Sequence, residues 1–399
     1  MPARPQTTYF LYELKNYFSS DHPLWKAPLP LHRNAASRIA HPKSAVTVNY
    51  GDYFQAVGQF LKKNHYNKLS TAVSRQIGRT INPQEIRNIR VCLEKHGAFY
   101  HPARIDVVGA DFRTKFVLNV AVSRTGRDTI EKEYGFIAKL NHDIQGHFLP
   151  NVYGRDDISL KKDLKLGMFL GEWFDGYHEF HLSRDRSDNT HKIRVWDPER
   201  QGFYLSAHQC RELYRQASRI LTSCYNVETT EHIYSWQHAS GDFIVKPENN
   251  SVDVKLIAVR SYESALKNRD RNTETIMYAL LVFFINLTIR MRLDRLDGTD
   301  ELAWSDDITV PGSVLGFLEG LAQKPGIDML PGPVDGCFMY QFVNQTQSDL
   351  LDISRTILDA YSPRAPEVPF IRQHLHKHIV VLRRVIYDFG ESVDFKVRT

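Results

Sequence analysis

The sequence contains little cysteine, and its cysteines are far apart. Among 399 residues there are four, at positions 92, 210, 224 and 337, and no two of them form a Cys-x-x-Cys pair. A disulfide framework and a zinc site built on cysteine are therefore not indicated. The scarcity favours a reducing compartment, and we expect a cytoplasmic location.

Long runs of one chemical character are also missing. The formal net charge is +5 and no long Lys/Arg run occurs, so charge does not indicate a nucleic-acid partner. The most apolar run, Met277 to Ile289, is too short to cross a bilayer, and we expect it to be a helix buried in a globular core rather than a membrane span. Residues 1–18 have neither a long apolar core nor a small-residue cleavage site, so we expect no secretory signal.

The composition is that of a soluble globular protein, with 42% hydrophobic and 24% charged residues. The length predicts two or three domain-sized units. Residues 1–85 predict an N-terminal helical region, with apolar residues at helical spacing near 50–64 and 69–80. Residues 86–176 predict a small β-rich unit, and residues 177–399 a mainly helical unit with a polar insertion near 183–203.

In the β-rich unit, apolar residues recur at every second position, then at helical spacing, and then at every second position again. Residues 90–108 predict two strands around a turn at His96-Gly97, and residues 115–123 predict a third strand. Residues 125–143 predict a helix, which Asp128 can cap. Two more strands are predicted within 147–154 and 164–174. Five strands with one helix after the third predict a compact α+β unit.

One stretch of the helical unit combines polar residues with two short apolar strands. Residues 235–263 read SWQHASGDFIVKPENNSVDVKLIAVRSYE, in which a His and a Gly-Asp pair precede an apolar strand, a polar turn and a second apolar strand. Helices are predicted around this stretch, at residues 210–225, 276–296, 314–323, 349–361 and 368–389.

This order of elements resembles the protein-kinase-like superfamily, and more closely its aminoglycoside and choline phosphotransferase branch. The resemblance covers about residues 86 to 390. It implies an α+β, two-lobed kinase-like fold, with a small five-stranded lobe carrying one helix and a larger helical lobe, to which an N-terminal helical extension is added here. It also implies ATP and Mg²⁺ as cofactors, and an unknown small-molecule or protein acceptor.

The resemblance assigns the nucleotide-binding positions one by one. Asn119 stands on the third strand, where the family has a Lys that holds the phosphates, and an Asn brings no positive charge. Glu133 takes the place of the helical Glu that pairs with that Lys, and Lys115 is the nearest alternative partner. Gly97 is the single glycine of the loop that covers the phosphates, whereas a phosphate cradle needs several exposed amides. The segment containing Glu172 and Phe174 corresponds to the hinge that holds the adenine.

Two alignments of the catalytic stretch remain open. If Asp242 replaces the metal-binding Asn, the catalytic position falls on Gln237, which is unable to act as a general base. Alternatively Asp242 is the catalytic residue beside His238, and the metal-binding Asn is one of the pair at 249 and 250. The second metal-binding Asp of the family is absent, because Ala258 and Arg260 stand there.

Three hypotheses follow. The first is an ATP-dependent phosphotransferase with Asp242 as base or metal ligand and His238 beside it. The second is a catalytically silent relative that binds a partner or a nucleotide. The third is an α+β binding protein unrelated to kinases. Three further clusters remain open as metal sites. His178 and His181, or His374 and His378, could hold a metal if each pair shares a helical face, and the acidic residues of 294–307 could bind a cation weakly. None completes a metal motif, and we interpret them mainly as polar surface and helix-end residues.

Overall fold

The computed structural model describes residues 5–12, 17–30, 47–97, 99–161, 164–197, 202–234, 236, 239–266, 271–362 and 364–392. The chain divides into two compact units. Unit 1 comprises Met1–Asp143 and Pro150–Asp175, and unit 2 comprises Ile144–Leu149 and Gly176–Thr399. The boundary at 175/176 lies one residue before the predicted boundary between the β-rich and helical units. Residues 1–85, by contrast, belong to unit 1 and do not form a unit of their own.

Unit 1 is built on a seven-stranded sheet in the order β2-β1-β3-β4-β5-β7-β6. The strands are β1 Gln6–Leu11, β2 Tyr17–Phe18, β3 Asn88–Leu93, β4 Ala103–Val108, β5 Arg113–Ala121, β6 Val152–Lys161 and β7 Leu164–Glu172. Only β1 and β3 pair in parallel among these neighbours. Strands β3, β4, β5 and β7 and helix α2 (Arg124–Asp143) lie where the sequence predicts them, whereas the strand predicted within 147–154 begins only at Val152 and continues to Lys161 as β6.

The N-terminal residues differ from the prediction of a helical region. Residues 6–11 and 17–18 are strands, because β1 lies beside β3 and extends the sheet of unit 1. Helix α1 (Tyr50–Ile77) contains both predicted helices, and its backbone leaves the helical conformation at 63–66, between them. A short 3-10 turn, Pro23–Lys26, precedes α1 and another, Pro83–Glu85, follows it. Asn49 and Asp52 cap the start of α1 reciprocally, and Gly78 ends it in the left-handed region at φ 79°.

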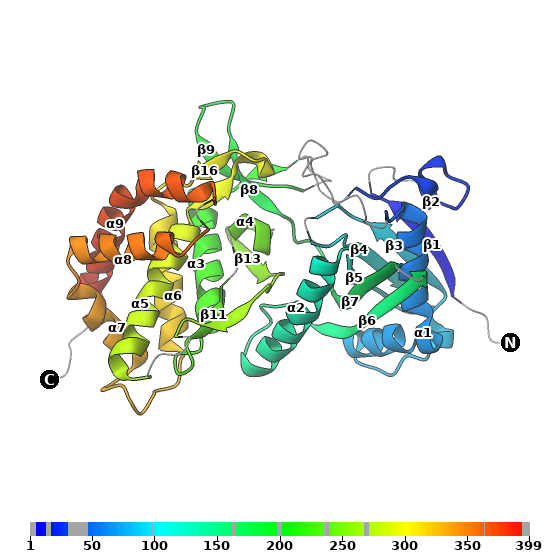
Figure 1. Ribbon diagram of the computed structural model, residues 1–399, viewed down its shortest axis with the longest axis horizontal. Helices are drawn as coiled ribbons and strands as arrows, with labels where there is room; N and C mark the ends of the chain where they lie inside the picture. Colours follow the sequence, from blue (N-terminus) through cyan, green and yellow to red (C-terminus); the bar gives the residue numbers. More distant parts are fainter. Residues whose placement is uncertain are drawn as a thin grey trace. The chain divides into compact units, whose positions relative to one another are not determined.

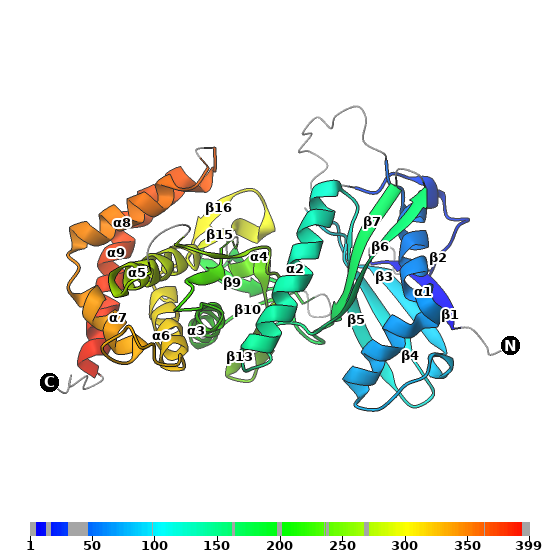
Figure 2. The same ribbon diagram turned by 60° about the horizontal axis from the view of Figure 1, so that its bottom comes forward.

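Helices α1 and α2 lie on opposite faces of the sheet (Figure 2). Successive side chains of β5 and β7 therefore face the two helices in turn. Phe116 and Leu118 belong to the same hydrophobic core as the buried residues of α1. The other face of the sheet meets α2, because the Phe169 ring lies 6.0 Å from the ring of Tyr134. Asn119 pairs with Phe169 and therefore lies on the α2 face.

Unit 2 is mainly helical (Figure 1). Its helices are α3 Ala207–Ser223, α4 Ala239–Asp242, α5 Thr273–Arg290, α6 Thr309–Ala322, α7 Val334–Val343, α8 Gln347–Asp359 and α9 Glu367–Ser392, with a 3-10 turn at Leu296–Gly298. Three antiparallel pairs accompany them: β11 Glu231–Ile233 with β14 Tyr262–Ser264, β12 Phe243–Glu248 with β13 Ser251–Leu256, and β15 Leu293–Arg295 with β16 Leu302–Trp304. The described part of the predicted polar insertion contains strands, since β8 Phe180–Arg184, β9 His191–Val195 and β10 Phe203–Tyr204 form a three-stranded sheet.

Helix α5 is buried in unit 2, and helices α3 and α6 pack closely together. Helix α5 is long and apolar enough to cross a membrane, with a mean hydropathy of 1.3, but 67% of that stretch is buried inside the protein, as in a core helix. The prediction of a buried helix at Met277–Ile289 is confirmed by this burial. Helices α3 and α6 touch through their backbones, because a Cβ added at Gly316 would lie 1.9 Å from the carbonyl oxygen of Arg215.

Candidate functional site

The site predicted around Asp242 lies at the start of the β12–β13 hairpin. The short helix α4 ends at Asp242, and β12 begins with the next residue. The carbonyl of Asp242 accepts a hydrogen bond of 2.8 Å from the amide of Ile257, which directly follows β13. This bond closes the open end of the hairpin and holds Asp242 opposite the segment containing Ala258 and Arg260.

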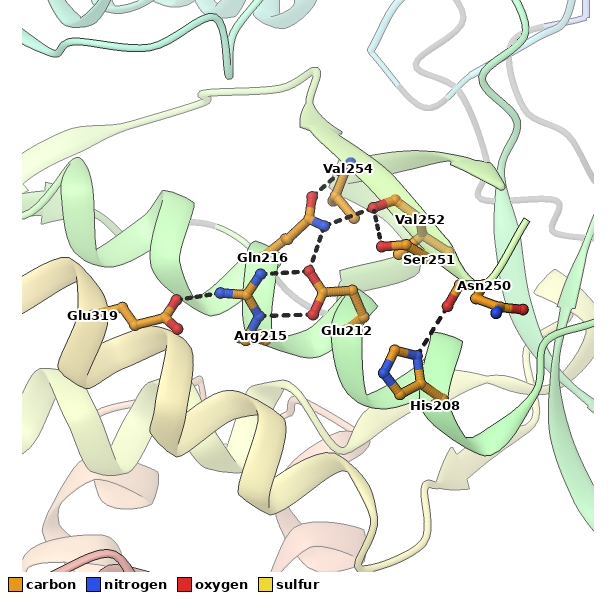
Figure 3. Close-up of polar contacts among 9 residues, drawn as sticks. All are labelled: His208, Glu212, Arg215, Gln216, Asn250, Ser251, Val252, Val254 and Glu319. Carbon is orange, nitrogen blue, oxygen red and sulfur yellow. Dashed lines mark hydrogen bonds and ion pairs between the residues drawn. The ribbon is translucent and has the colours of Figure 1, made fainter. Parts of the chain in front are cut away.

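Helix α3 holds the other side of this hairpin (Figure 3). The side-chain amide of Gln216 donates to the carbonyl of Val252 at 2.6 Å and accepts from the amide of Val254 at 3.1 Å. It therefore pairs with the edge of β13 as another strand would. At the turn of the hairpin, Nδ1 of His208 lies 2.9 Å from the carbonyl oxygen of Asn250.

An ion-pair network fixes Gln216 in turn (Figure 3). Arg215 contacts Glu212 through two hydrogen bonds of 2.7 and 2.5 Å, and contacts Glu319 of α6 at 2.5 Å. Glu212 also accepts from Gln216 at 2.7 Å. Burial alone would raise the pKa of Glu212, but the hydrogen bonds from Arg215 and Gln216 outweigh it and lower that pKa. These groups brace α3, α6 and the hairpin against one another.

The Asp242 carboxylate is buried and forms an ion pair with Arg260. Asp242 is 2% exposed, and its Oδ1 accepts from Nη1 of Arg260 at 2.5 Å. The Arg260 side chain is 26% exposed, so its guanidinium bridges from the buried carboxylate toward the surface. A buried carboxylate requires a compensating positive charge, and here the chain supplies that charge itself.

A second buried carboxylate supports α4. Asp294 of β15 is 3% exposed and accepts hydrogen bonds from the Ser240 hydroxyl and from the amides of Leu182 and Arg295, the last two at 2.6 and 2.7 Å. Nδ1 of His181 lies 3.3 Å from the same carboxylate. The sequence pattern predicted that Asp294 belongs to a helix end. Its bonding role depends on residues 54 and 113 positions away, which no local pattern reveals.

The alternative metal ligands in the polar turn are excluded by the length of the hairpin. Strand β12 has six residues, so Asn249 and Asn250 lie at the opposite end of it from Asp242, roughly 20 Å away. The sequence hypothesis that these Asn residues complete a metal site with Asp242 is therefore wrong. His238 and Gln237 lie outside the described residues. Among the described residues, no group of three or more His, Cys, Asp or Glu side chains is arranged to hold a metal ion.

The predicted nucleotide-binding residues of unit 1 bond mainly to their own unit. Glu133 is 1% exposed and accepts a hydrogen bond from the hydroxyl of Tyr100. Asn119 lies half-buried on the α2 face of β5. Lys115, the alternative partner of Glu133, instead lies 2.6 Å from Asp175, so the proposed Lys115–Glu133 pair is not formed.

The loop between β3 and β4 is tied to its surroundings. The amide of Gly97 donates to the carbonyl of Tyr100 at 2.9 Å, and a Cβ on Gly97 would lie 2.7 Å from that oxygen. Glycine is therefore required by a tight turn, and its amide already has an acceptor. The amide of His101 donates to Val120 of β5 at 2.8 Å, which fixes the end of the loop on the sheet.

The predicted hinge residue Glu172 also forms hydrogen bonds within unit 1. The amide of Glu172 donates to the carbonyl of Asn151 at 2.8 Å, and its carboxylate accepts from the amide and the side chain of Asn151 at 3.1 and 2.9 Å. Phe174 is 8% exposed. Glu172 therefore fastens the start of β6 to the end of β7.

The histidine motifs of the sequence have structural positions in unit 2. His178 and His181 do not share a helical face, because His181 lies in strand β8. The backbone of His178 pairs with Val245 of β12 through two bonds of 2.9 Å. His378 is fully buried, and burial lowers its pKa to about 3, with a further contribution from Arg292.

Comparisons with known proteins give little guidance. No family model matches the chain. No curated protein matches it. Solved structures do match, and one of them is titled "WaaP in complex with acyl carrier protein", with 10% sequence identity and a TM-score of 0.30, covering 65% of this chain and 86% of that chain. A TM-score this low does not by itself establish a shared fold.

Proposed function

We propose that this chain is a kinase-like protein that acts by binding rather than by metal-dependent phosphate transfer. The kinase-like assignment is supported by the order of elements: five strands with a helix after the third in unit 1, and a Gly-Asp pair leading into a hairpin in unit 2. The mixed α+β architecture of two units is compatible with it.

The ion pair between Asp242 and Arg260 carries the proposal. The phosphotransferase hypothesis assigns Asp242 as the base or as a ligand of Mg²⁺. A carboxylate that binds Mg²⁺ needs oxygen atoms with accessible lone pairs. Here a guanidinium contacts that carboxylate at 2.5 Å, and Ala258 offers no second carboxylate. The residues present therefore do not fit a magnesium ion at this position. The arginine takes over the charge compensation that a metal would provide.

The residues of unit 1 support the same conclusion for the nucleotide. Asn119 brings no charge for a phosphate, and Glu133 is buried and accepts a hydrogen bond from the hydroxyl of Tyr100. The amides of Gly97 and Glu172 already donate to backbone carbonyls of their own unit. Phosphate binding needs positive charge and exposed donors, and this unit directs the corresponding groups inward.

The competing function, ATP-dependent transfer to a small-molecule or protein acceptor, requires Asp242 to leave Arg260. Thermal shift with ATP, with and without Mg²⁺ or Mn²⁺, distinguishes the two functions on the full chain. We expect no metal-dependent rise of the unfolding midpoint for the wild type. A metal-dependent rise that disappears in Asp242→Ala would refute the proposal and support the phosphotransferase.

A gain-of-binding variant provides the control. Ala258→Asp combined with Arg260→Gln adds a second carboxylate and removes the guanidinium, so we expect metal binding to appear in this variant. The proposal includes a cytoplasmic location, which the four free cysteines favour. The partner belongs to the same classes as the acceptor predicted from the sequence, a small molecule or a protein.

A further inference from the structure

A cavity of about 510 Å³ lies within unit 2, between helix α9 and the residues at the end of β16 and directly after it. Its charged and aromatic lining residues are Arg292, Trp304, Asp306, Asp307, His374 and Lys377. It is built from a different part of the chain than the hairpin that carries Asp242. The proposed function does not use it.

One of the lining residues, Arg292, is a buried arginine with one nitrogen that has no hydrogen-bond partner among the described residues. Arg292 is 2% exposed. Its Nε and Nη2 donate to the carbonyl of Ser305 at 3.1 and 2.8 Å, and Nη2 also donates to Asp307 at 2.7 Å. Within the described part of the chain, its Nη1 has no hydrogen-bond partner although it is buried. An unpaired donor of a buried charged group is costly, and an acceptor from outside the chain would satisfy it.

An aromatic wall stands beside this guanidinium. The Arg292 guanidinium carbon lies 5.2 Å from the centroid of the Trp304 ring, and His374 of α9 stacks on Trp304 at 5.0 Å with an interplanar angle of 7°. Burial lowers the pKa of His374, and the positive charges of Arg292 and Lys377 lower it further. These effects favour the neutral form of His374, and the wall contributes apolar contact area.

The charged side chains around the cavity are balanced in sign. Lys377 is 75% exposed and lies 3.8 Å from Asp307, which already bonds to Arg292. Asp306 is exposed, and in the part of the chain that the structure describes its carboxylate makes no hydrogen bond or ion pair. Two cationic and two anionic side chains therefore line the cavity. A simple anion would meet both aspartates, and a simple cation would meet both bases.

We propose that this cavity binds a small zwitterion of the amino-acid type. Its carboxylate would bond to Nη1 of Arg292 and to Lys377, and its ammonium group would bond to Asp306. Charge-assisted hydrogen bonds of this kind are stronger than neutral ones, and a carboxylate matches the planar guanidinium. The side chain of the ligand would pack on the Trp304–His374 wall.

The test uses the full chain and the twenty L-amino acids, added one at a time in a thermal-shift measurement. Acetate and methylammonium, at the same concentration, serve as single-charge probes. We expect at least one amino acid to raise the unfolding midpoint more than either probe does. A rise of equal size with acetate alone would overturn the zwitterion assignment, and no rise with any amino acid would overturn the site.

Isothermal titration on variants locates the binding. Asp306→Asn and Lys377→Gln change exposed side chains, and we expect each to weaken the affinity by about tenfold or more. The matched controls are Asp352→Asn and Arg355→Gln, an exposed ion pair on α8, which should leave the affinity unchanged. Equal affinity in all four variants would overturn the site, since binding would then occur elsewhere.

Discussion

Removal of the Arg260 guanidinium tests whether the chain itself neutralises Asp242. Arg260→Gln removes the guanidinium that contacts this carboxylate, which is 2% exposed. Breaking a buried ion pair from one side costs about 3–5 kcal/mol. Because the Arg260 side chain is 26% exposed, we expect the lower end, about 3 kcal/mol of unfolding free energy. Asp242→Asn leaves an arginine that reaches water, and should cost about 1–2 kcal/mol.

The double variant separates the pair from its surroundings. When both charges are absent, no buried carboxylate is left uncompensated, so the double variant should be more stable than the sum of the single changes predicts. We expect a coupling free energy of about 1–2 kcal/mol, measured by urea denaturation of the four proteins. The exposed pair Arg355–Asp352 serves as a control and should lose less than about 0.5 kcal/mol. Additive single effects at Asp242 and Arg260 would refute the reasoning.

Further predictions concern the framework of unit 2. Gly316→Ala forces α3 and α6 apart and should cost about 2–3 kcal/mol in a denaturation experiment, whereas Gly336→Ala in α7, where a Cβ meets nothing within 4 Å, should gain up to about 1 kcal/mol. Gln216→Ala should cost roughly 1–3 kcal/mol and speed hydrogen exchange of the Val254 amide, and an unchanged exchange rate would contradict the role of that side chain. His378, whose pKa is lowered to about 3, binds its proton in the unfolded chain first, so stability should fall as the pH drops from 6.5 toward 3, by at most about 1.4 kcal/mol per pH unit. His378→Gln should flatten that slope, which pH-dependent denaturation measures.

The order of elements in the β-rich unit was predictable because its signals are local. Alternating burial along β5 and the helical stripe of α2 follow directly from residue spacing. The break within α1 at 63–66 overlaps the gap at 65–68 between the two predicted helices. The strands at 6–11 and 17–18 were not, because β1 pairs in parallel with β3, about 80 residues later, and such pairing leaves no local pattern.

The bonding of the candidate site was less predictable than the elements that carry it. The sequence indicated Asp242 as a site residue and showed Arg260 where an acidic residue was expected. It did not indicate that these two side chains contact each other. The hydrogen bond between Glu133 and Tyr100 was not predictable either, because the two residues are 33 positions apart and Tyr100 lies in a loop. Side-chain partners across turns depend on the folded backbone, whereas the residue types alone left a metal site at Asp242 possible.

The most direct test of the account is calorimetric titration of Mn²⁺ and Mg²⁺, each with ATP, into the wild-type chain and the Ala258→Asp/Arg260→Gln variant. Because Arg260 compensates Asp242 in the wild type, the account predicts no metal-dependent heat for the wild type and a measurable heat for the variant. Metal-dependent ATP binding by the wild type, abolished by Asp242→Ala, would contradict it.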